Sequence, residues 1–115
     1  MTMLATFLLL LVAALHLYFL VLEMFLWTRP LGLKTFRNTP EKAATTRVLA
    51  ANQGLYNGFL AAGLLYAAGT GSREFATFFL GCVVVAGLYG AWSVNRRIFF
   101  VQALPAIAGL LALFL

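Results

Sequence analysis

Residues 4–27 read LATFLLLLVAALHLYFLVLEMFLW, and the only charged side chain among them is Glu23. At 1.5 Å per residue, a helix of this length crosses a hydrocarbon core of about 30 Å. Arg29 and Pro30 follow, and proline disfavours helical backbone in the residue before it. The stretch therefore predicts a first membrane-spanning helix. It continues beyond the length of a signal peptide and has no charged residue before it, so we expect it to be retained.

Three further apolar stretches predict three further spans, at residues 48–68, 74–94 and 98–115. Thr39-Pro40-Glu41 is typical of a helix start, so the second helix should begin ahead of its span. The run Gly69-Thr70-Gly71-Ser72 predicts a turn before the third span. Pro105 should free one backbone carbonyl in the fourth, which membrane helices tolerate when neighbouring groups repair the defect.

Composition indicates that the solvent of this chain is lipid. Of its 115 residues, 63% are hydrophobic and 10% are charged, against about 25% charged in soluble domains. A soluble domain this small could not bury so much apolar surface. The sequence therefore predicts an all-α membrane protein, with residues 1–115 forming one four-transmembrane-helix bundle in the bilayer.

The basic side chains predict the orientation of the bundle. Arg96 and Arg97 lie in the third connection, Arg73 lies alone in the second, and the first connection, residues 28–47, carries the other five of the eight Lys and Arg residues. Basic loops stay in the cytoplasm. We therefore predict a multi-pass protein of the inner (cell) membrane, with a basic cytoplasmic loop at 28–47 and both termini non-cytoplasmic. No basic helix face is left to bind nucleic acid.

Polar side chains inside spans are expensive and mark the candidate site. Glu23 and His16 are seven residues apart, so they share one face of the first helix. The depth of each residue from its loop predicts that the polar groups of three helices converge in the cytoplasmic half of the bundle. The candidates from the other helices are Asn52, Gln53, Tyr56, Asn57 and Gln102, with Trp27, Tyr89 and Trp92 as secondary candidates at the boundary.

The leading functional hypothesis is a cytoplasm-facing polar cavity that binds or transports a small molecule, a lipid headgroup or a proton-coupled solute. Glu23 would carry the charge, His16 would be its deeper companion, and the amides would orient the ligand. Apolar walls with a few convergent polar groups are typical of ligand sites.

Two alternatives stay open. The first is a membrane enzyme acting on a lipid or quinone-like substrate, with His16 and Glu23 as acid and base. No reactive nucleophile is visible, which weighs against catalysis. The second is a structural or assembly protein in which the amides hold helices together, at about 0.6 kcal/mol each. In that reading Glu23 would be a structural partner of Arg47, Arg96 or Arg97, reaching up from the boundary. Gly54 and Gly58 have the spacing of a close helix contact and could join copies in a homo-oligomer.

The sequence predicts no metal site and no cofactor. One histidine, one cysteine (Cys82) and one carboxylate within a span cannot fill a tetrahedral zinc shell. Phosphate loops, nucleophile elbows and dinucleotide fingerprints are also missing.

Several motifs together resemble a known family. They are Ala14-Leu15-His16-Leu17-Tyr18, Leu22-Glu23-Met24 with Trp27, Ala51-Asn52-Gln53-Gly54-Leu55-Tyr56-Asn57-Gly58-Phe59-Leu60-Ala61 and Val101-Gln102-Ala103-Leu104-Pro105-Ala106. Across nearly the whole chain, this pattern is similar to the domain-of-unknown-function 1304 family of small bacterial membrane proteins. The resemblance implies a four-helix integral membrane protein and brings no established activity, substrate or cofactor.

Overall fold

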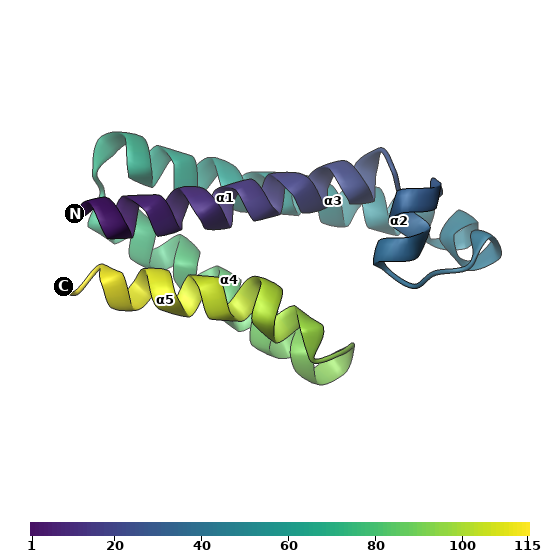
Figure 1. Cartoon of the computed structure of the whole chain (residues 1–115). Helices are drawn as coiled ribbons and strands as arrows, with labels where there is room; N and C mark the ends of the chain where they lie inside the picture. The colour runs from purple at the N-terminus through teal and green to yellow at the C-terminus, as the bar shows by residue number, and fades with distance from the viewer. The chain divides into compact units, whose positions relative to one another are not determined.

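The computed structural model describes residues 1–115, and every regular element in it is a helix (Figure 1). The elements are α1 (Met3–Met24), α2 (Pro30–Thr35), α3 (Pro40–Thr70), α4 (Arg73–Ser93), the π-helix η1 (Phe99–Ala103) and α5 (Leu104–Ala112). The predicted all-α class is confirmed.

Two of these helices, α1 with 22 residues and α4 with 21, are long and apolar enough to cross a membrane by length and composition. The segment Phe99–Ala112 is apolar but shorter. Helix α3 is the longest, with 31 residues, but polar side chains interrupt its apolar sequence. Asn52, Gln53 and Asn57 lie within the part of α3 that the sequence predicts to span the membrane.

The chain divides into two compact units. Unit 1 comprises Met1–Leu15 and Leu60–Leu115, and unit 2 comprises His16–Phe59. The core of unit 1 is made of small and branched apolar side chains from α1, α3, α4 and α5. Its fully buried members include Leu9, Leu64, Leu80 and Val83.

Within unit 1, α4 and the η1–α5 segment run side by side in opposite directions (Figure 1). Gly87 makes this close approach possible, since a Cβ there would lie 2.6 Å from the backbone nitrogen of Ala103. The π-helix immediately precedes Pro105, which has no N–H to donate. Leu104 N–H instead bonds the Phe99 carbonyl, five residues back. The wider turn accommodates the predicted proline defect.

The predicted helix starts and turns are present. The backbone N–H of Lys42 donates to Thr39 Oγ1 at 3.2 Å, so Thr39 caps α3 as expected. Ser72 caps α4 by accepting from the N–H of Phe75, also at 3.2 Å. Between them, Gly71 has a φ of 71°, the left-handed conformation that ends a helix at little steric cost to glycine.

The first helix ends earlier than predicted, at Met24 rather than Trp27. The N–H groups of Phe25 and Leu26 both bond the Val21 carbonyl, which widens and ends the last turn. Pro30 does not terminate α1. It occupies the first turn of α2, where a missing N–H costs nothing. The segment 28–47 is therefore a short helix and the first two turns of α3 rather than an irregular loop.

The glycine contact in unit 1 generates a stability prediction. Gly87→Ala should lower the free energy of unfolding by about 1–3 kcal/mol, because the new methyl group meets backbone that cannot move aside. Thermal unfolding in detergent micelles, followed by circular dichroism, measures the change. Gly81→Ala is the matched control on the same helix, since nothing lies within 4 Å of its Cβ position. Equal melting temperatures for the two variants would contradict the close packing.

Candidate functional site

Unit 2 brings one carboxylate and one amide of the predicted set together. Asn57 Nδ2, near the middle of α3, donates a hydrogen bond to Glu23 Oε1, in the last turn of α1. Asn57 is buried, with 5% of its surface exposed, whereas Glu23 is half-buried. The bond ties α1 to α3, and the Glu23 side chain as a whole is only partly buried.

Two glycines of α3 allow this approach. A Cβ on Gly54 would lie 2.6 Å from Met24 Cγ and 3.2 Å from the Leu20 carbonyl oxygen. A Cβ on Gly58 would lie 2.8 Å from Leu20 Cδ1. The Gly-x-x-x-Gly spacing thus lets α1 and α3 of the same chain come close, as the spacing indicated. A contact between copies through these glycines stays a prediction.

His16 lies two turns before Glu23 on α1 and is completely buried. Its ring meets the Phe19 ring edge-on, with the centroids 5.2 Å apart. The His16 side chain is therefore enclosed by protein and does not lie on an exposed surface.

The remaining polar residues of α3 do not join the Glu23–Asn57 pair. Asn52, Gln53 and Tyr56 are all exposed. Asn52 Nδ2 donates to the carbonyl of Val48, one turn back on its own helix, at 2.9 Å. The polar face of α3 is therefore wider than the contact with α1, and only Asn57 points into that contact.

Three of the other predicted residues belong to unit 1. Gln102 is half-buried in η1. Tyr89 and Trp92 are exposed near the end of α4, with ring centroids 6.0 Å apart. Their exposure agrees with the positions of interface anchors.

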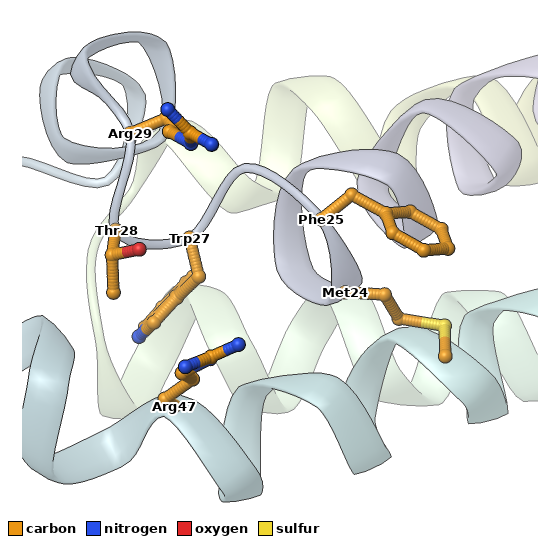
Figure 2. Close-up of a pocket in the computed structure, with 6 residues that line it drawn as sticks. All are labelled: Met24, Phe25, Trp27, Thr28, Arg29 and Arg47. Atoms are coloured by element: carbon orange, nitrogen blue, oxygen red, sulfur yellow. The ribbon is translucent and has the colours of Figure 1, made fainter.

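A polar pocket of about 430 Å³ lies where α1 ends (Figure 2). Trp27 is fixed beside it, because its Nε1 donates to Thr46 Oγ1 at 3.0 Å and its ring packs 4.9 Å from the Phe36 ring. The lining residues are Met24, Phe25, Trp27, Thr28, Arg29 and Arg47.

This pocket was not predicted from the sequence, in which the arginines indicate orientation and Trp27 indicates a position at the membrane boundary. The signal that could have found it is the spacing of Trp27 and Arg29 at the end of one helix against Arg47 early in the next. No three side chains among His, Cys, Asp and Glu are grouped so that they could hold a metal ion.

Fold and site together define a small all-helical protein with an acid–amide pair between two helices, two of its helices being able to cross a membrane. Residues 10–114 match the family described as "Protein of unknown function (DUF1304)", and the chain belongs to this family. It is also similar to the "Uncharacterized protein YpaA" of Lactococcus lactis subsp. lactis (strain IL1403), with 31% identity over 118 residues that cover 99% of each chain. The family assigned from the motifs is thereby confirmed. No solved structure matches the chain.

The Glu23–Asn57 bond generates a second stability prediction. Asn57→Leu removes the donor and leaves a half-buried carboxylate without its partner, so it should cost about 1–3 kcal/mol of stability. Asn52→Leu is the matched control, because this exposed amide bonds only its own helix and its loss should change stability by less than about 0.5 kcal/mol. Thermal unfolding in one detergent compares them. If both variants unfold with the wild type, the bond does not hold α1 to α3.

Proposed function

We propose that the chain is a multi-pass protein of the inner membrane that binds a small molecule through Glu23. The observation that carries the proposal is the state of this carboxylate. It belongs to an apolar helix, it accepts a hydrogen bond from Asn57, and its side chain is only partly buried. Ionisable groups in such helices are costly, so they are retained where they act.

The chemistry of the pair suggests the class of ligand. The amide occupies one carboxylate oxygen, Oε1, and fixes the orientation of the group. A partner with a hydrogen-bond donor or a positive charge can then bind the accessible part of the carboxylate. A small solute, the amine of a lipid headgroup and a proton-coupled solute all satisfy this requirement.

The membrane arrangement is part of the proposal. We infer that α1, α3, α4 and the η1–α5 segment each cross the bilayer, with residues 25–39 and 94–98 on the cytoplasmic side. Seven of the eight Lys and Arg residues lie in or beside these two connections, and this asymmetry supports the orientation. In this proposed orientation, the Glu23 end of α1 lies towards the cytoplasm.

The proposed orientation predicts the behaviour of reporter fusions. Alkaline phosphatase, which folds only outside the cytoplasm, should be active when fused to either terminus. The same reporter inserted after Asn38 or after Asn95 should be inactive while being present in the membrane fraction. Active phosphatase at either connection, or inactive phosphatase at either terminus, would exclude the orientation.

An open carboxylate at Glu23 predicts selective chemical labelling. In lipid vesicles, an apolar carbodiimide, which partitions into the bilayer, should modify Glu23 in preference to the exposed Glu41 and Glu74. Mass spectrometry of peptides measures the adducts, and Glu23→Gln is the control that removes the reactive group. A small molecule that binds the site should slow the labelling, which makes the reaction a screen for the ligand.

A purely structural role for the pair gives the opposite results. Asn57 is buried and the glycines bring the helices close, which are also features of a contact that only holds helices together. In that case Glu23 would resist the reagent in the folded protein and react only after unfolding. Glu23→Gln, which can still accept from Asn57, separates the two roles, since it keeps the contact and removes the charge.

A further inference from the structure

We propose that the pocket at the end of α1 binds a phosphate group, carried by an anionic lipid or by a soluble phosphate compound. The pocket has no acidic side chain in its lining, and two arginines contribute to it. Glu23 is not among the lining residues, so the inference stands apart from the function proposed for that carboxylate.

The two arginines come from different elements. Arg29 precedes α2, at the end of the connection from α1, and Arg47 lies in the second turn of α3. Figure 2 shows both side chains beside the same hollow, with Trp27 between them. Guanidinium groups are planar and always charged, and they bind phosphate oxygens through paired N–H donors. Two of them around one pocket create a local positive charge that an anion relieves.

The hydroxyl of Thr28 adds a further donor to the lining. Met24 and Phe25 form an apolar edge on the side where α1 ends, and Phe25 is 67% exposed. A pocket with a cationic part and an adjoining apolar edge suits an amphiphile whose phosphate meets the arginines and whose chain follows the helix.

Three contacts hold the pocket in shape without a ligand. Trp27 is bonded to Thr46 and packed on Phe36. Gly32 of α2 is buried, and a Cβ there would collide with the Leu26 carbonyl oxygen, so α2 sits directly on the connection. The backbone that carries Arg29 is therefore held in place, so the freedom lost on binding is mainly that of the exposed arginine side chains.

The test uses the full chain in neutral detergent and the fluorescence of Trp27 as the probe. The second tryptophan, Trp92, is removed by Trp92→Phe, so that the signal reports only the pocket. The ligands are dioctanoyl phosphatidic acid, its phosphate-free counterpart dioctanoylglycerol, and inorganic phosphate.

We expect saturable binding of phosphatidic acid and none of dioctanoylglycerol. The double variant Arg29→Gln/Arg47→Gln should raise the dissociation constant about tenfold or more, since it removes the charged donors. The matched control is Lys34→Gln/Lys42→Gln, which removes the same charge from two basic residues outside the pocket and should change the constant less than about twofold. Circular dichroism verifies that both variants keep their helices.

Comparing phosphatidic acid with inorganic phosphate also identifies the source of the phosphate group. Binding of the lipid alone assigns the pocket to a headgroup, and binding of inorganic phosphate as well assigns it to soluble phosphate compounds. Two results would overturn the proposal. One is no saturable change with either phosphate ligand, and the other is equal weakening by both double variants, which would reduce the effect to general attraction by a basic segment.

Discussion

The arrangement of unit 2 depends on how closely α1 and α3 approach each other. Gly54 and Gly58 have no side chains that would separate the two helices. The side chains of Leu20 and Met24 therefore pack close to the α3 backbone. At that separation the short Asn57 side chain reaches Glu23 and donates to its carboxylate. With larger residues in place of the glycines, the same acid would have no donor from α3. A carboxyl group buried in an apolar helix without a hydrogen-bond donor would lower the stability of the fold.

Local features of the chain could be predicted from the sequence because they depend on neighbouring residues alone. The cap at Thr39 and the turn at Gly71 follow from the conformations that threonine and glycine favour. The class of fold followed from composition. The end of α1 at Met24 could not be predicted in the same way, since the segment that follows it bonds through Trp27 to Thr46, a residue distant in sequence.

At the candidate site, too, the sequence predicted what depends on neighbouring residues but not what depends on the contact between helices. Spacing singled out Glu23 and a set of amides on α3, but it could not say which amide donates to the acid. Asn52 and Asn57 are five residues apart, so they lie more than a third of a turn from each other around the helix. A rotation of α3 by about 140° would exchange their roles. Only the glycine contact sets that rotation, and it turns Asn57 inward and leaves Asn52 exposed.

The arginine pocket was missed for a different reason. Basic residues beside a span have a sufficient explanation in membrane orientation, so nothing in their number suggests a further role. What distinguishes Arg29 and Arg47 is that folding brings them to one hollow. Met24 connects this hollow to the acid–amide pair, because its side chain packs on Gly54 and also lines the pocket. The residue that follows Glu23 in the chain thus belongs to both sites. Any change that moves α1 against α3 therefore alters the wall of the pocket as well as the bond from Asn57 to Glu23.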